Sequence, residues 1–118
     1  KGNRPPFYGE RNQDTVWNIA YDGKRSEIGH PTAKPVKLFA IPMLNHTKRN
    51  EVCYEPFAGS GSQIIAGEQL GRWVFALELE PRYVDVVVKR FVSFVGSAEG
   101  VYCERDGEKI AYQELFGE

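Results

Sequence analysis

The chain has 118 residues, the length of one domain or of part of one. Hydrophobic residues make up 42% and charged residues 26%, which is ordinary for a globular chain and excludes a disordered one. The formal net charge of -1 excludes a polybasic arm or an acidic tail as the main feature. No apolar run approaches the roughly 20 residues of a membrane span, and we expect no signal peptide at the start.

The first 35 residues are rich in Gly, Pro, Asn and charged side chains. This composition predicts loop, with one short strand at residues 15–19. Pro35 then suits the first turn of a helix that continues to Leu44. Pro42 lies inside that run and lacks a backbone N–H, so we expect a kink or an early end there.

The middle of the chain alternates strands and helices. Residues 51–55 read as a strand, a turn of small residues follows at 56–61, and a helix opens at Ser62 or just before it and ends at Gly71. Residues 73–77 form an unbroken apolar run, which predicts a strand buried on both faces. A helix then begins at Pro81 and stops at Gly96, with Lys89 and Arg90 on the face opposite its apolar residues.

The tail reads as a β-hairpin, with strands near 101–103 and 110–112 around Asp106-Gly107. The order strand, helix, strand, helix predicts an α/β fold with a parallel sheet. We divide the chain into a loop-rich lead-in (1–35), a βαβα unit (36–96) and a hairpin tail (97–118). Two parallel strands leave at least one sheet edge open, so we expect further sequence or a partner chain to complete the sheet.

The two cysteines, Cys53 and Cys103, have no CxxC spacing. Cys53 lies in an apolar run, where a cysteine behaves as a small core residue. The sequence therefore predicts no metal site, and its cysteine usage favours a reducing, intracellular setting.

The turn Gly59-Ser60-Gly61 follows a strand and precedes a helix. Glycine allows a ligand to approach the backbone closely, and the helix start offers free N–H groups. Glu78 ends the next strand, where a carboxylate can accept hydrogen bonds from both hydroxyls of a ribose. Read alone, the turn fits equally well a tight strand-to-helix connection that binds nothing.

The residues around this turn discriminate between nucleotide ligands. The dinucleotide motif GxGxxG is not met, because Ile64 occupies its third glycine position, and the phosphate loop GxxxxGK[ST] is absent. Glu55 ends the first strand beside the turn, where it would repel a phosphate and favour a cationic group. The sequence therefore favours S-adenosylmethionine over NAD or ATP, and a nicotinamide dehydrogenase is the disfavoured alternative.

Three ordered segments carry a family resemblance: HPTAKP at 30–35, EPFAGSG at 55–61 and ELEPRY at 78–83. Together they resemble DNA methyltransferases that modify the amino group of adenine or cytosine, in the permuted class whose catalytic half comes first. The resemblance covers about residues 14–96. It implies a partial Rossmann-like methyltransferase sheet that binds S-adenosylmethionine, with DNA as the partner of the complete enzyme. It also implies a bacterial or phage origin and a cytoplasmic location.

The resemblance also assigns residues to the cofactor. The turn would wrap its methionine part, with Glu55 next to the amino group, and Glu78 would hold the ribose. Ser62 stands where the family commonly has Thr, and since it keeps a hydroxyl this difference is expected to matter little. Trp73, Phe75 and Phe91 are expected in the core. The implied cofactor-binding set is Thr32, Lys34, Glu55, Pro56, Phe57, Ala58, Gly59, Ser60, Gly61 and Glu78.

The family transfers the methyl group with a [DNS]PP[YFW] motif, whose polar side chain accepts a hydrogen bond from the target amine. The nearest match is Arg4-Pro5-Pro6-Phe7, and an arginine cannot accept a hydrogen bond. We therefore expect no catalytic residue here and an inactive chain that needs the missing N-terminal catalytic part or a second copy. The alternative is a non-catalytic assembly module that pairs through its open sheet edge.

Overall fold

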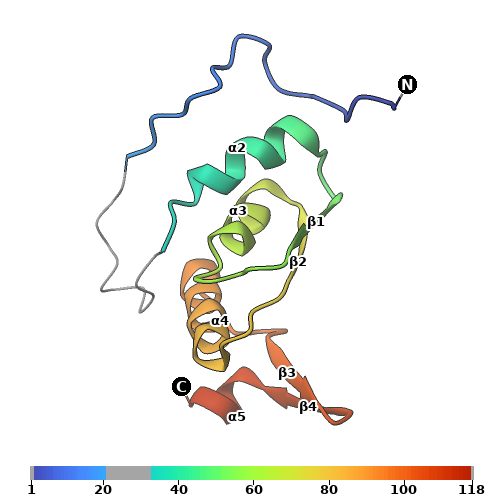
Figure 1. Cartoon of the computed structure of the whole chain (residues 1–118). Coiled ribbons are helices and arrows are strands. Elements are labelled where there is room, and N and C mark those ends of the chain that lie inside the picture. Colours follow the sequence, from blue (N-terminus) through green and yellow to red (C-terminus); the bar gives the residue numbers. More distant parts are fainter. Residues whose placement is uncertain (1, 21–32, 118) are drawn as a thin grey trace.

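A computed structural model of the chain describes residues 2–20 and 33–117 (Figure 1). The predicted order of strand, helix, strand, helix and hairpin is confirmed, so the chain is α/β. In chain order the elements are α2 (Lys37–His46), β1 (Val52–Glu55), α3 (Ser62–Leu70), β2 (Trp73–Ala76), α4 (Pro81–Val95), β3 (Tyr102–Arg105), β4 (Glu108–Ala111) and α5 (Tyr112–Phe116).

Strands β1 and β2 pair in parallel, with Cys53 opposite Val74 and Tyr54 opposite Phe75. Helices α2 and α3 pack on each other, and Figure 1 shows both on one side of this sheet. Helix α3 approaches β2 at Gly67, where an added Cβ would lie only 2.3 Å from Val74 Cγ2. A glycine at that position lets the helix lie close to the sheet.

The other face of the β1–β2 sheet is open, so the prediction of burial on both faces is wrong for this chain. Val52, Tyr54, Trp73 and Phe75 are each between 59% and 66% exposed, and they share this face because side chains alternate along a strand. Trp73 and Phe75 are therefore not core residues here, and Cys53 and Phe91 are half-buried. An apolar run predicts what a strand can bury, but burial depends on a covering element.

The predicted strand at residues 15–19 is wrong. Thr15 and Val16 form a bend, residues 17–20 have no regular structure, and Val16 is 72% exposed. The stretch is β-prone in composition, but it lies beside α2, with Val16, Trp17 and Leu44 lining one hollow. None of the described strands pairs with it to complete a backbone ladder.

Pro42 neither ends nor shortens α2, which continues to His46. The missing N–H costs one helical hydrogen bond, but residues outside the helix make hydrogen bonds that stabilise its last turn. Thr47 caps that turn, with its N–H and its hydroxyl both donating to the Met43 carbonyl at 2.9 and 2.5 Å. The Asn45 side-chain amide is paired with that of Gln13.

Helix α4 begins where its sequence predicts. Glu80 is the N-cap, and its carboxylate accepts hydrogen bonds from the Arg82 N–H at 3.3 Å and from Arg82 Nε at 3.1 Å. The Arg82 hydrogen bonds hold the pKa of the Glu80 carboxyl below its usual range. This cap therefore stabilises α4 above the unfolded-state pKa of Glu80, and its contribution is lost as the pH falls through the lowered folded-state value.

The tail forms the predicted hairpin, with β3 and β4 antiparallel and Asp106-Gly107 between them. Both turn residues have positive φ, 53° and 82°, as a type I′ turn requires. The second strand stops at Ala111, however, and Tyr112 begins the short helix α5 rather than extending the hairpin. No helix in the described ranges is long and apolar enough to cross a membrane.

Candidate functional site

The turn at residues 56–61 lies at the carboxyl ends of β1 and β2 and is bonded to both strands. Its Ala58 N–H donates to the Leu77 carbonyl just beyond β2, at 2.8 Å. Its Phe57 N–H donates to Glu55 Oε1 at the end of β1, also at 2.8 Å. These bonds fix the turn at the crevice where ligands of open α/β sheets bind.

Glu78 lies against the glycine turn, as the sequence predicts. Its Oε2 accepts a hydrogen bond from the Gly59 N–H at 2.7 Å, and its Oε1 accepts one from the Glu80 N–H at 3.0 Å. The carboxylate thus joins the β1–α3 turn to the end of β2. Its role toward a ribose stays a prediction, while its role in holding the turn is a finding that sequence reasoning missed.

Arg90 reaches the same turn from α4. Its Nη1 donates to the Ser60 carbonyl at 3.1 Å, to Ser60 Oγ at 3.3 Å and to Ser62 Oγ at 2.9 Å. The prediction that Arg90 lies on the face away from the apolar residues is therefore wrong. The sequence contained the information needed to predict this contact. Arg90 follows Val87 by three residues, so the two share a helix face, and Val87 packs against Gly61.

Ser62 connects the turn to the segment before α2. It is 1% exposed, and its hydroxyl donates to the Lys34 carbonyl at 2.5 Å. Ser62 keeps the hydroxyl that the family's usual Thr would supply, and this hydroxyl joins the HPTAKP segment to the residue that follows EPFAGSG. Thr32, together with His30 and Pro31, lies outside the described residues.

A cavity of about 230 Å³ lies at this turn. It is smaller than the roughly 300–1,000 Å³ of ordinary small-molecule sites, so it can take part of a nucleoside-sized ligand. Six of the ten predicted site residues line it; Pro56 and Gly61 belong to the same turn, and Glu78 is bonded to its Gly59. The lining residues are Lys34, Phe39, Glu55, Phe57, Ala58, Gly59, Ser60, Ser62 and Gln63.

Gln63 is a lining residue that sequence reasoning missed. It is 3% exposed, and its Nε2 lies 3.5 Å from the Phe57 carbonyl oxygen. Its Oε1 is buried and has no hydrogen-bond partner within the described part of the chain. The available signal was a long polar side chain in the first turn of a helix that continues with apolar Ile64 and Ile65.

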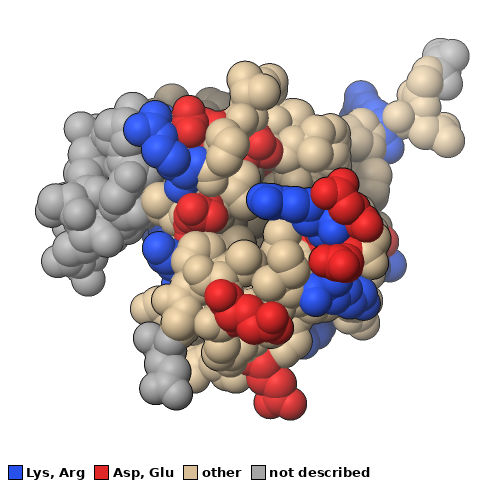
Figure 2. Space-filling model, turned by 90° about the horizontal axis from the view of Figure 1, so that it is seen from below, with Lys and Arg blue, Asp and Glu red and all other residues tan. Residues whose placement is uncertain are grey.

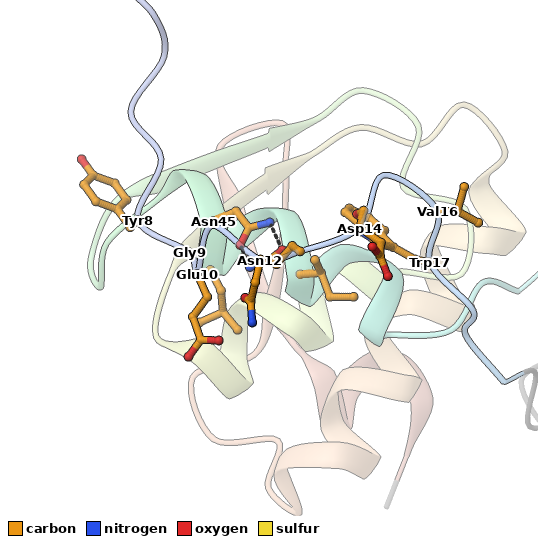
Figure 3. A pocket seen from close by; sticks show the side chains of 11 residues that line it. Tyr8, Gly9, Glu10, Asn12, Asp14, Val16, Trp17 and Asn45 are labelled. Carbon is orange, nitrogen blue, oxygen red and sulfur yellow. Dashed lines mark hydrogen bonds between the residues drawn. The ribbon is translucent and has the colours of Figure 1, made fainter.

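A larger hollow of about 600 Å³ lies between the N-terminal segment and α2 (Figure 3). Gln13 and Asn45 both line it, and their side-chain amides form two reciprocal hydrogen bonds of 2.8 Å. Trp17 lines it, and its Nε1 donates to the Asp14 carbonyl at 3.0 Å. None of the residues predicted for the cofactor is among the residues that line this hollow, so it is separate from the sequence motifs.

The face seen in Figure 2 carries acidic and basic side chains side by side, with neither sign forming a continuous patch. It therefore offers no single-sign surface of the kind that tracks a phosphate backbone. Across residues 2–20 and 33–117 there is no group of three or more His, Cys, Asp or Glu side chains placed to hold a metal ion.

Arg90→Ala is expected to lower the free energy of unfolding by about 2 kcal/mol, because the turn loses hydrogen bonds to a charged donor. Lys89→Ala is the matched control: it removes the same charge from the same helix, but its Nζ lies 4.6 Å from the Phe116 ring centre, away from the turn. Urea denaturation measures both. An equal loss in the two variants would show that Arg90 does not hold the turn.

The chain is similar to known DNA methylases. The sequence model of a family described as DNA methylase, N6/N4 type, matches residues 6–89. Curated relatives include the type II methyltransferases M2.MboI of Moraxella bovis, 29% identical over 70% of this chain and 31% of the relative, and M.HinfI of Haemophilus influenzae, 31% identical over 69% and 24%. M.Cfr9I of Citrobacter freundii is 35% identical over 70% of this chain and 27% of the relative.

Solved structures agree with the fold. The M1.HpyAVI–SAM complex superposes with a TM-score of 0.59 at 26% identity, covering 74% of this chain and 43% of that one. A putative DNA modification methylase of Thermus thermophilus, complexed with S-adenosyl-L-methionine, has a TM-score of 0.51 at 23% identity and covers 68% and 40%. The chain spans less than a third of each curated relative named here. On the family match and the shared fold, the chain belongs to the N6/N4 DNA methylase family.

Proposed function

We propose that this chain carries the S-adenosylmethionine-binding part of a DNA methyltransferase that modifies a base amino group. The observation that carries the proposal is the 2.7 Å hydrogen bond between the Gly59 N–H and Glu78 Oε2. It unites the glycine turn after β1 and the carboxylate after β2 at one edge of a parallel sheet. Relatives of the same family are type II methyltransferases, and a neighbour of like fold was solved with the cofactor.

Each cofactor group has a matching residue in the proposal. The turn 57–61 brings its backbone close to the methionine part, because its glycines carry no side chain. Glu55 provides negative charge for the ammonium, and Lys34 provides positive charge for the carboxylate. Thr32 is a second candidate for the carboxylate, and Glu78 accepts the ribose hydroxyls. When bound, the cofactor supplies a methyl group activated by its sulfonium.

The cavity volume limits what this chain holds alone. About 230 Å³ is below the usual range for a whole nucleoside site, so we assign the enclosed part to the methionine moiety. Gly61 forms the base of the turn, and the space beside it is filled by Val87, whose Cγ1 would lie 2.8 Å from an added Cβ. The turn is therefore backed by packed side chains rather than by solvent.

We propose that the methyl-transfer motif lies outside this chain. In Arg4-Pro5-Pro6-Phe7 the polar acceptor is replaced by a cation. The Pro6 carbonyl lies 2.9 Å from His46 Nδ1, and the Phe7 ring packs edge-on against the His46 ring at 5.6 Å. These contacts hold the segment at the end of α2, and none of its residues lines the cavity beside the glycine turn.

The chain alone is therefore expected to show no methyl transfer to DNA above background, measured with radiolabelled cofactor. Phe7→Ala is the informative variant, and Phe94→Ala is its match, because both rings are 46% exposed and Phe94 lies on α4. Transfer by the wild-type chain that is lost in Phe7→Ala and kept in Phe94→Ala would overturn the assignment and make this segment catalytic.

We propose that the open β1–β2 face is covered by the remaining part of the methyltransferase fold. This chain spans only 31% of M2.MboI and 24% of M.HinfI, which leaves most of the fold to other residues. Parallel sheets are normally covered on both faces, and this face exposes Tyr54, Trp73 and Phe75. The second candidate function, a non-catalytic assembly module, rests on the same open sheet, since β1 and β2 pair only with each other among the described strands.

Sedimentation equilibrium separates the two candidates. A monomer at micromolar concentration is expected if the face awaits the rest of the fold. A dimer that dissociates when Trp73→Lys is introduced would favour the assembly module, provided that a change at Leu115, which is apolar and lies on another element, leaves the dimer intact. Leu115 is 45% exposed on α5 and makes a suitable control.

A further inference from the structure

The buried amide of Gln63 is a polar group that the proposed cofactor contacts do not use. Gln63 is 3% exposed, and Phe39, Glu55 and Gln63 line both the cavity at the turn and a second hollow of about 290 Å³ between α2 and β1. These three side chains therefore form the boundary between the two spaces. Of the three, Gln63 is the one with a buried atom that lacks a hydrogen-bond partner among the described residues.

The orientation of the amide follows from its neighbour. Gln63 Nε2 lies 3.5 Å from the Phe57 carbonyl oxygen, which can only accept a hydrogen bond. The opposite rotamer would place two acceptors, Oε1 and that carbonyl oxygen, against each other. The amide nitrogen therefore faces the turn, and Oε1 is left as a buried acceptor of a residue that lines the cavity.

A buried carbonyl oxygen without a donor is costly, so such a group is normally satisfied by a ligand or an ordered water. The same cavity is lined by Glu55, whose Oε1 already accepts the Phe57 N–H at 2.8 Å. A glutamine with an unpartnered oxygen and a glutamate that line the same cavity favour a ligand group that has several N–H donors and a positive charge. An ammonium has both properties.

We propose that Gln63 Oε1 accepts a hydrogen bond from the α-ammonium of the methionine moiety and selects for ligands that carry it. The inference rests on the proposed function and deepens it, because it assigns ammonium selectivity to a residue outside the sequence motifs. In this proposal the negative charge of Glu55 attracts the ammonium, and the hydrogen bond to Gln63 Oε1 fixes its orientation.

Calorimetric titration with two ligands tests this role: S-adenosylmethionine and its deaminated analogue, in which hydrogen replaces the ammonium. Gln63→Met keeps the side-chain length and removes the acceptor. We expect it to weaken S-adenosylmethionine binding about tenfold, the effect of one hydrogen bond to a charged donor, and to leave the affinity for the analogue unchanged. Gln69→Met, an exposed position of the same helix, is expected to change neither affinity.

Equal losses for both ligands, or no loss for either, would overturn the role of Gln63 while leaving the proposed function intact. A wild-type chain that binds neither ligand would overturn the proposed function itself. One measurement needs no variant: the side-chain amide resonances of Gln63 are expected to shift with S-adenosylmethionine and not with the analogue. Their failure to shift with S-adenosylmethionine, when the turn amides do shift, would also overturn the inference.

Discussion

Gly61→Ala is expected to lower the free energy of unfolding by about 2–4 kcal/mol, the largest stability effect of any single substitution proposed for this chain. Gly61 has a φ of 77°, and a Cβ there would lie 2.8 Å from Val87 Cγ1 and 3.0 Å from Val87 Cγ2. The variant therefore combines left-handed backbone strain with overpacking against α4. Urea denaturation followed by circular dichroism measures the loss.

Gly96→Ala is the matched control, because Gly96 has a φ of 78° and open space around its Cβ position. It isolates the backbone cost, about 1–2 kcal/mol, from the cost of the Val87 contact. Adding Val87→Ala to Gly61→Ala is expected to recover part of the difference. Equal losses in the two glycine variants would contradict the close packing of α4 behind the turn.

Glu78→Ala is expected to weaken S-adenosylmethionine binding about 10- to 100-fold, because the ribose hydroxyls lose a charged acceptor. The same change also leaves the part-buried Gly59 N–H without its acceptor, so stability falls by about 1–3 kcal/mol. The sequence alone assigns Glu78 to the ribose and gives no reason to expect this loss of stability. Calorimetry on the folded fraction measures the affinity.

Glu68→Ala provides the control for Glu78, since Glu68 is an exposed carboxylate on the neighbouring helix α3. It removes the same charge and is expected to leave the affinity unchanged. Glu78→Ala that loses stability and keeps its affinity would reduce Glu78 to a residue that only holds the turn.

The sequence predicted what is encoded locally. The ends of α3 and α4 lie at Gly71 and Gly96, as expected, because a left-handed glycine ends a helix whatever packs around it. The strands on either side of the glycine turn, β1 and β2, were likewise predictable from short apolar runs bounded by turn residues. The same local reasoning placed Glu78 beside Gly59, because parallel strands bring their carboxyl ends to one edge.

What the sequence could not predict depends on contacts between distant segments. Arg90 lies 30 residues after Ser60, and only the crossing of α4 behind the turn brings the two together. Gln63 became a candidate only when its burial and its unpartnered oxygen were visible. The strand predicted at residues 15–19 had suitable residues but no partner among the described strands. The apolar face of Trp73 and Phe75 had no cover in the described structure.

Titration of the ¹⁵N-labelled chain with S-adenosylmethionine, followed by backbone NMR, tests the proposed site most directly. The largest amide shifts are expected at Gly59, Ser60 and Gly61, with smaller ones at Glu78 and around Gln63. NAD at the same concentration is expected to leave these amides unshifted. Shifts confined to the hollow of residues 8–17, or no shift in the turn at millimolar S-adenosylmethionine, would contradict a cofactor site at the carboxyl ends of β1 and β2.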